Sequence, residues 1–501
     1  MAYQQRECKK VHSTCWLYVL TSEQPSYQQP NVNAILRLDS SSFVQELGLS
    51  GSLLCVTDEQ ILISSFMLDS QAVPRRLETK GNPQRLTYSK HLNKIIVVLD
   101  ELTFERGATL EEPLMRRKLR PALQFIDPEE NFTNTKVEPH VTAVGEPGDR
   151  VTSIMNWTPS DGTKHYEMII IGIEADSPDT EHSSGRLLCM SAKQASSSAA
   201  LDVKPKYVKK FPRQPIYSLC PYDISSLLVG AGNDLVMMHL DVGARKWQQV
   251  AKFALPSPAA ALTTRGSLVY AATMHHSMEI IECIKGKLAM HSSDLQARNA
   301  NSIIACDNGV AIVSSTSTNI RGGRITGFSA QATRRESQVI FQADLPLIVN
   351  NLKAGFTLPP DDSSRQCVYA STLDGTMYYL TTLNQNEWRL LHFLECLINQ
   401  GAIVMTRRRR RQRRANTEPP KPSPEDMHIH GEIVAQLLGR GTQWVRNLLK
   451  QETDTEDSLG EIPGSAEERQ KVFSTLAQAV IGESEDPVAG VATWLRTLIR
   501  N

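Results

Sequence analysis

The sequence has few of the residue patterns that mark enzymes, and it has no long hydrophobic run. It contains no Walker A motif, no G-x-S-x-G, no H-E-x-x-H, and no G-x-G-x-x-G after a strand-like segment. The longest aliphatic stretches, near residues 95 and 170, are too short to cross a bilayer. We therefore expect a protein that is not an enzyme, holds no cofactor, binds no small-molecule substrate and does not span a membrane.

Cysteine is also used without a recognisable pattern. The nine cysteines are widely scattered and form no C-x-x-C pair, which argues against a structural zinc site and against a disulfide framework. The first residues, MAYQQRECKKVHSTCW, are charged and lack the apolar segment of a signal peptide. These absences indicate an intracellular protein in a reducing compartment.

Two isolated motifs could hold a phosphate or a metal, but each has a simpler interpretation. Gly230-Ala-Gly232 is close to a phosphate loop, yet a second strand-like run follows where a helix would be needed, so we expect a β-hairpin. His428 and His430 alternate along an extended segment and could share one face, but no third ligand is near, so a polar linker is favoured.

What the chain does have is a long series of short apolar runs separated by turn residues. The series covers about residues 31–400 and is clearest over 226–281, where no convincing helix separates the runs. A sandwich, a barrel and a propeller all fit such a pattern. The length favours a propeller, because about 370 residues at about 40–50 per blade give on the order of seven or eight blades, and we expect about seven. The Gly-His…Trp-Asp signature is missing, so the sequence predicts an irregular, non-WD40 β-propeller.

Longer loops are expected to interrupt the strands at 105–120, 174–185, 194–206 and 331–337. Helical periodicity first appears over residues 388–397, and it returns in four segments of the C-terminal tail. These segments begin near Ile433, Trp444, Ala466 and Val488, with a break at Gly439 and Gly441. The sequence thus predicts a small α-helical C-terminal domain, either autonomous or docked on the propeller. We expect Trp444 and Trp494 to pack inside this tail or against the last propeller blade near Trp388 and Leu391, because an exposed tryptophan is costly.

The most unusual segment is RRRRRQRR at residues 407–414, followed by a tail of opposite charge. Residues 415–501 hold 14 acidic and 8 basic residues, a net charge of −6. Clustered guanidiniums repel one another and pack poorly, so the segment is predicted to be a solvated linker that binds nucleic acid or an import receptor. A solvated loop without a partner is the alternative. The candidate binding residues are Arg407, Arg408, Arg409, Arg410, Arg411, Arg413 and Arg414.

The order of these segments resembles the C-terminal region shared by three large scaffold proteins. They are the large subunit of the damaged-DNA-binding complex, splicing factor 3b subunit 3, and the large subunit of the cleavage and polyadenylation specificity factor. The matching segments include VPRRLETKGNPQRLTYSKHLNKIIVVL (73–99), LLVGAGNDLVMMHLD (227–241), LDGTMYYLTTLNQNEWRLLHFLECLI (373–398) and HGEIV (430–434). No single motif is specific, and the ordered set carries the likeness over about residues 50–501.

The resemblance implies an N-terminal extension (1–30), a β-propeller (31–400), an Arg- and Pro-rich linker (401–430) and a helical C-terminal domain (431–501). It implies a nuclear scaffold that binds protein partners in a nucleic-acid-processing complex, of the DNA-repair and ubiquitin-ligase adaptor type. The alternative is a nucleic-acid-binding subunit of a splicing or pre-mRNA 3′-end processing complex. Family members carry two further N-terminal propellers, so we expect either a truncated fungal member of the DNA-repair branch or a partial paralogue of it. No residue can be assigned to cullin binding.

Overall fold

The computed structural model describes most of the chain between residues 79 and 499, together with four short segments before it. The described residues are 15–21, 32–37, 53–57, 61–64, 79–105, 116–128, 140–160, 165–175, 183–194, 201–241, 244, 246–306, 309–316, 322–329, 335–356, 366–372, 374–407, 427–450 and 465–499. The chain divides into two compact units. One unit comprises Met1–Thr21 with Thr79–Asn501, and the other is Ser22–Glu78.

The smaller unit contains one antiparallel sheet of three strands in the order β2-β3-β4. Its described strands are β2 (Val32–Arg37), β3 (Leu53–Thr57) and β4 (Ile61–Ser64).

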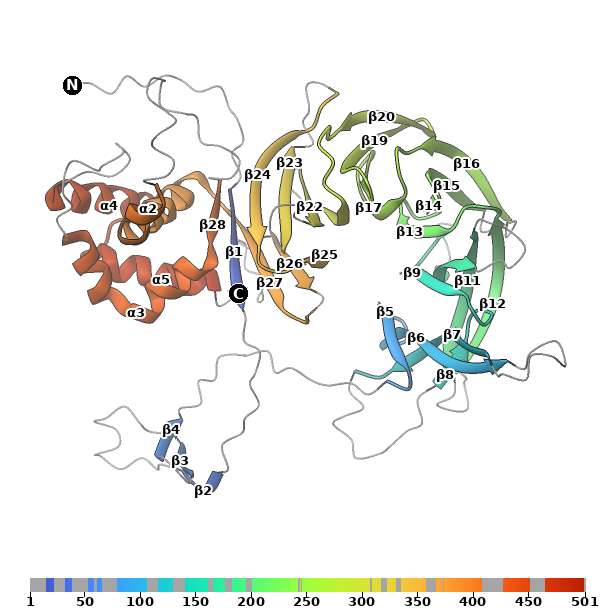
Figure 1. The fold of residues 1–501 in the computed structure, drawn as a ribbon, viewed down its shortest axis with the longest axis horizontal. Helices are drawn as coiled ribbons and strands as arrows, with labels where there is room; N and C mark the ends of the chain where they lie inside the picture. Colours follow the sequence, from blue (N-terminus) through green and yellow to red (C-terminus); the bar gives the residue numbers. More distant parts are fainter. Residues whose placement is uncertain are drawn as a thin grey trace. The chain divides into compact units, whose positions relative to one another are not determined.

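The larger unit is mainly β, as the sequence predicts, and its described residues form six sheets (Figure 1). Five of these sheets are antiparallel, and each uses four strands that are consecutive in the chain. Their strands are β5 (Asn82–Ser89), β6 (Lys94–Glu105), β7 (Arg116–Ile126), β8 (His140–Ala143), β9 (Arg150–Trp157), β10 (Met168–Ala175), β11 (Ser184–Gln194), β12 (Leu201–Phe211), β13 (Ile216–Pro221), β14 (Ser226–Ala231), β15 (Asp234–Asp241), β16 (Lys246–Ala254), β17 (Ala259–Arg265), β18 (Leu268–Thr273), β19 (Met278–Ile284), β20 (Lys287–Ser293), β21 (Ala300–Ala305), β22 (Val310–Thr316), β23 (Gly323–Ser329) and β24 (Gln338–Leu345).

The sixth sheet joins both ends of the chain and has the strand order β25-β26-β27-β1-β28. Its members are β25 (Val349–Phe356), β26 (Gln366–Thr372), β27 (Met377–Leu383), β1 (Cys15–Thr21) and β28 (His428–His430). Strand β1 pairs antiparallel with β27 and parallel with β28. The sequence interpretation missed β1, which lies in the predicted N-terminal extension.

The hairpin between β14 and β15 shows why these residues form strands and turns. Gly232 adopts a φ of +53°, in the left-handed region that tight turns require and glycine tolerates best. Ala231 pairs with Asp234 across the turn, so the Gly230-Ala-Gly232 segment forms a hairpin, and that prediction is confirmed. All six residues of β14 are buried, because both faces of this sheet are covered.

When β1 of the last sheet is set aside, so that β25 is the first strand of that sheet, the first strand of every described sheet in chain order carries the same irregularity. One residue near the start of that strand is skipped in the pairing with the second strand, which is a β-bulge. The skipped residues are Asn33, Gln84, Thr152, Tyr217, Ala260, Asn301 and Asn350. Seven sheets, including the sheet of the smaller unit, thus repeat one local geometry.

Neighbouring sheets of the larger unit meet at these first strands, where hydrogen bonds connect them. Thr152 Oγ1 on β9 donates to the carbonyl of Ile216 on β13, and Ser218 Oγ on β13 donates to the carbonyl of Ala259 at 2.8 Å. Further along, the N–H of Leu352 on β25 donates to Ser302 Oγ on β21 at 3.1 Å. Apolar clusters fill the space between successive sheets.

The helices follow the last sheet, as the sequence predicts. They are α2 (Gln385–Arg407), α3 (Gly431–Lys450), α4 (Ala466–Ile481) and α5 (Pro487–Ile499). Helix α3 is kinked at Gly441, which has a φ of 76°, so the predicted break is confirmed. Helix α4 starts at the N-cap Ser465, whose hydroxyl accepts the N–H of Glu468.

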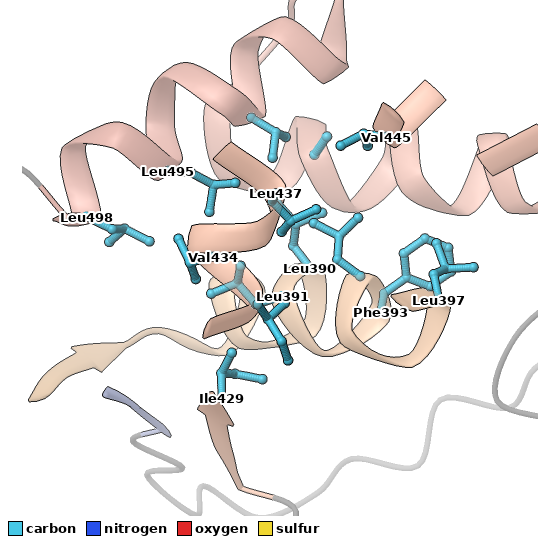
Figure 2. Packing of buried hydrophobic residues seen from close by; sticks show 14 of the residues in the cluster. Leu390, Leu391, Phe393, Leu397, Ile429, Val434, Leu437, Val445, Leu495 and Leu498 are labelled. Atoms are coloured by element: carbon cyan, nitrogen blue, oxygen red, sulfur yellow. The ribbon is translucent and has the colours of Figure 1, made fainter. Parts of the chain in front are cut away.

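The four helices share one apolar core with the last sheet. Figure 2 shows Leu391 of α2, Val434 and Leu437 of α3, and Leu495 of α5 directed toward one another. Residues Tyr379 and Leu383 of β27 belong to the same cluster. The helical tail is therefore packed on the β body and on α2, one of the two arrangements that the sequence left open.

Trp444 and Trp494 pack against this core, as the sequence predicts, although both stay half-buried, whereas their neighbours Val445 and Leu495 are buried. Two other expectations from the sequence were wrong in detail. The predicted loop at 105–120 contains the start of β7, and the predicted loop at 194–206 contains the start of β12. Lysine, arginine and proline in these strands hid the alternation that normally reveals a strand.

Candidate functional site

A two-stranded ribbon at the end of the first four-stranded sheet exposes three large apolar side chains. Strand β5 pairs with β6 only as far as Asp100, while the β6–β7 pairing continues to Glu105. On this extension Leu102, Phe104 and Leu119 are 54%, 56% and 50% exposed. Leu102 lies directly opposite Leu119, and Phe104 is two residues further along the strand, so the three side chains share one face.

The base of this apolar ribbon is fixed by hydrogen bonds to backbone carbonyl groups. The N–H of Gly148 donates to the carbonyl of Leu119 at 2.8 Å, and Arg120 Nε donates to the carbonyl of Gly145 at 2.9 Å. Thr103 Oγ1 donates to the carbonyl of Lys118 at 3.0 Å. A fixed ribbon with an exposed apolar face is suited to bind a protein surface, because ordering it on binding costs little.

A second surface is basic and lies on the edge strand β12. This strand reads LDVKPKYVKKF, and its lysines are Lys204, Lys206, Lys209 and Lys210. Lys204 forms an ion pair with Asp202 at 2.7 Å, and Lys209 Nζ lies 5.5 Å from the centroid of the Phe211 ring. Within the described part of the chain, no carboxylate lies within ion-pair distance of Lys206 or Lys210.

Two physical roles fit this basic edge strand. Lysine and proline on an edge strand prevent pairing with another sheet, and unpaired ammonium groups attract a polyanion. Tyr207 stacks on Trp247 of β16, with ring centroids 5.7 Å apart, which holds β12 in place. The sequence interpretation treated the first part of this strand as a loop, although the spacing of Tyr207, Lys209 and Phe211 is that of one strand face.

The arginine residues predicted from the sequence lie mostly outside the described residues. Arg407 is the last residue of α2, and the structure does not describe Arg408, Arg409, Arg410, Arg411, Arg413 and Arg414. Both flanks of this segment belong to the same unit, because α2 precedes it and β28 follows it. The predicted boundary at residue 400 falls inside α2.

The remaining histidine candidates have local structural roles. Ile429 between His428 and His430 is buried, and the two imidazole centroids are 6.0 Å apart. His430 immediately precedes α3, so the pair lies in a strand that joins the last sheet to the helices. Among the described residues, no group of three or more His, Cys, Asp and Glu side chains could hold a metal ion.

A buried carboxyl group between two sheets was not predicted from the sequence. Glu279 on β19 is 5% exposed, and burial together with the nearby Asp294 carboxylate raises its pKa to about 7. Asp294 itself pairs with Arg298 at 2.6 Å, and Arg298 also donates to Gln342 on β24 at 3.0 Å. In the sequence, Glu279 is one of two acidic residues within the apolar run MEIIECI, and this position in an apolar run is the only signal of its burial.

No helix in the described part of the chain has the length and apolar character needed to span a membrane. The chain matches no protein family model and no curated protein. The likeness to the three scaffold proteins therefore stays a prediction that rests on the ordered segments.

Proposed function

We propose that this protein is an irregular β-propeller of about seven blades with a helical C-terminal domain. The bulge repeated in the first strand of all seven described sheets supports this proposal, because equivalent bulges imply equivalent positions in a repeated architecture. The adjacency of successive first strands in the larger unit is the packing that radial blades need around an axis. Strand β1 adds an N-terminal strand to the last sheet, as ring closure would require.

We propose that the function is that of a nuclear, non-enzymatic scaffold that binds protein partners in a nucleic-acid-processing complex. The sequence resemblance implies a scaffold of the DNA-repair type, which serves as an adaptor of a ubiquitin ligase. The apolar ribbon of Leu102, Phe104 and Leu119 carries this proposal, because a fixed and exposed apolar face favours protein binding. The packed helical tail offers a second rigid surface on the same unit.

Affinity purification of the full chain from nuclei, with a ribbon variant and a matched control, tests the scaffold role. The double variant Leu102→Ser with Phe104→Ser should lose co-purifying subunits of a repair or RNA-processing complex. The control Leu86→Ser, 70% exposed on the neighbouring strand β5, should retain them. Recovery of the wild-type chain alone after cross-linking in nuclei, at the mass of a monomer, would overturn the scaffold proposal.

A second candidate function is nucleic-acid binding in a splicing or 3′-end processing complex. The lysines of β12 and the seven arginines at 407–414 favour it, because both supply cations for a phosphate backbone. Fluorescence anisotropy with single-stranded oligonucleotides over a salt series distinguishes the two candidates. Each neutralised phosphate should add roughly −0.7 to −0.9 to the log–log salt slope. The absence of any salt-dependent binding would eliminate this second candidate.

A further inference from the structure

Helix α2 brings a thiol, an imidazole and a carboxylate together on its partly exposed side. His392 Nε2 lies 3.7 Å from Cys396 Sγ, and His392 Nδ1 lies 3.6 Å from Glu395 Oε2. The residues are three and four positions apart, which is the spacing that places helical side chains beside one another. Leu391 and Leu394 lie on the buried side of the same helix, whereas His392, Glu395 and Cys396 are partly exposed.

The imidazole of His392 is held between these partners by a third contact. The Trp388 ring stacks on it with a centroid distance of 4.9 Å and an interplanar angle of 7°. The Cys396 sulfur and the Glu395 carboxylate raise the pKa of His392 to about 10. His392 is therefore an imidazolium at neutral pH, with one N–H facing the sulfur and the other facing the carboxylate.

A cation beside a thiol is the environment in which cysteines become nucleophilic, because the thiolate is the reacting species and the cation stabilises it. We infer that Cys396 is a reactive thiol that exchanges with small, low-molecular-weight disulfides, with His392 and Glu395 as its positioning residues. This modification site is independent of the scaffold role proposed above.

The exchange balances without any further oxidant. Cys396 loses its proton to solvent, and the thiolate attacks one sulfur of the small disulfide. The S–S bond of that molecule breaks as a new S–S bond to Cys396 forms, and the other half leaves as a thiolate that takes a proton from solvent. One thiol and one disulfide are present before and after the reaction.

Cys283 is a suitable internal reference for a reactivity measurement. Among the six cysteines whose side chains the structure describes, it is the other partly exposed one, and Cys189, Cys220, Cys306 and Cys367 are buried. Cys283 lies on β19, in the β body, where its thiol neighbours the Tyr222 hydroxyl rather than a cation. Peptide mapping by mass spectrometry separates the adducts of Cys283 and Cys396 in one reaction of the full chain.

The experiment measures the rate of mixed-disulfide formation with oxidised glutathione as the probe at pH 7. Cys396 should react about tenfold faster than Cys283, since an adjacent cation favours the thiolate. His392→Phe keeps an aromatic ring to stack on Trp388 but removes the cation, and it should bring the two rates together. Glu395→Gln should lower the Cys396 rate by a smaller factor, and neither variant should alter the Cys283 rate.

Circular dichroism and limited proteolysis of each variant report whether the helical domain remains folded. If His392→Phe unfolds the helical domain, the inference is still tested by the rates of Cys396 and Cys283 in the wild-type protein and by the Cys396 rate in Glu395→Gln. Equal rates at Cys396 and Cys283 in the wild-type protein would overturn the inference. So would a Cys396 rate that stays unchanged in a folded His392→Phe variant.

Discussion

Trp16 on β1 lies in register beside His428 on β28, although about 400 residues separate them in the chain. The same strand β1 pairs on its other side with β27 over its whole length, from Cys15 opposite Leu383 to Thr21 opposite Met377. The N-terminal strand is thus the element between the β body and the segment that leads into α3. The last sheet and the start of the helical tail depend on a strand from the opposite end of the sequence.

Removing β1 should therefore weaken the attachment of the helical tail. A variant lacking residues 1–21 leaves the edge of β27 unpaired and takes away the only strand partner of β28 in the described residues. Limited proteolysis should cut within 408–426 at a lower protease concentration than in the wild type. The control lacks residues 1–14 and keeps β1. Equal cleavage of the two variants would contradict this expectation.

The core of the helical tail should be sensitive to loss of a single aromatic side chain. Phe473 on α4 is 1% exposed and lies in the cluster that joins the four helices to β27. Phe473→Ala should destabilise this domain by about 3–5 kcal/mol, through lost burial and the cavity left behind. Urea unfolding followed by far-ultraviolet circular dichroism should show an earlier helical transition. Thr475→Ala, at an exposed position of α4, is the control, and an equally early transition there would argue against the packing.

The sequence was most informative where local chemistry determines the structure. The turn at Gly232 and the break at Gly441 were predicted because both positions need a positive φ that glycine adopts easily. Strand β1 was missed because its stability comes from pairing with β27, a contact that no local pattern records. The proximity of Glu279 to Asp294 was missed for the same reason, since it depends on the pairing of β19 with β20 and the chain that follows. The cluster of thiol, imidazole and carboxylate groups on α2 could have been predicted from the sequence, because His392, Glu395 and Cys396 have the i, i+3, i+4 spacing of neighbours on a helix.

Stability should fall as pH rises through the range in which Glu279 ionises. Burial and the Asp294 carboxylate raise the folded-state pKa of Glu279 from 4.5 to about 7. Between these two values the folded state binds more protons than the unfolded state, so the free energy of unfolding decreases with rising pH. Glu279→Gln should remove this dependence and stabilise the protein at pH 8 by about 3 kcal/mol, with little effect at pH 4. Thermal unfolding from pH 4 to 8 measures the change, with Glu282→Gln on the same strand as the control. A wild-type profile that is unchanged by Glu279→Gln would contradict the assignment.

The basic edge strand and the arginine-rich segment should contribute to polyanion binding through charge alone. Lys206→Gln with Lys210→Gln removes two exposed ammonium groups from β12, and replacing the five arginines at 407–411 with alanine removes most of the arginine-rich segment. Each set should weaken the binding of single-stranded oligonucleotides. The magnitude of the salt slope should fall by roughly 0.7 for each phosphate that the variant no longer neutralises.

The two sets of substitutions should differ in the cell. The arginine variant should also accumulate less in the nucleus, because clustered basic residues are read by import receptors, whereas the β12 variant should not. Thermal unfolding should be unchanged in both, since surface charges away from packed features contribute little to stability. Binding that weakens equally for charged and uncharged ligands would indicate damage to the fold. Unchanged affinity together with unchanged localisation of the arginine variant would leave the solvated loop as the role of residues 407–414.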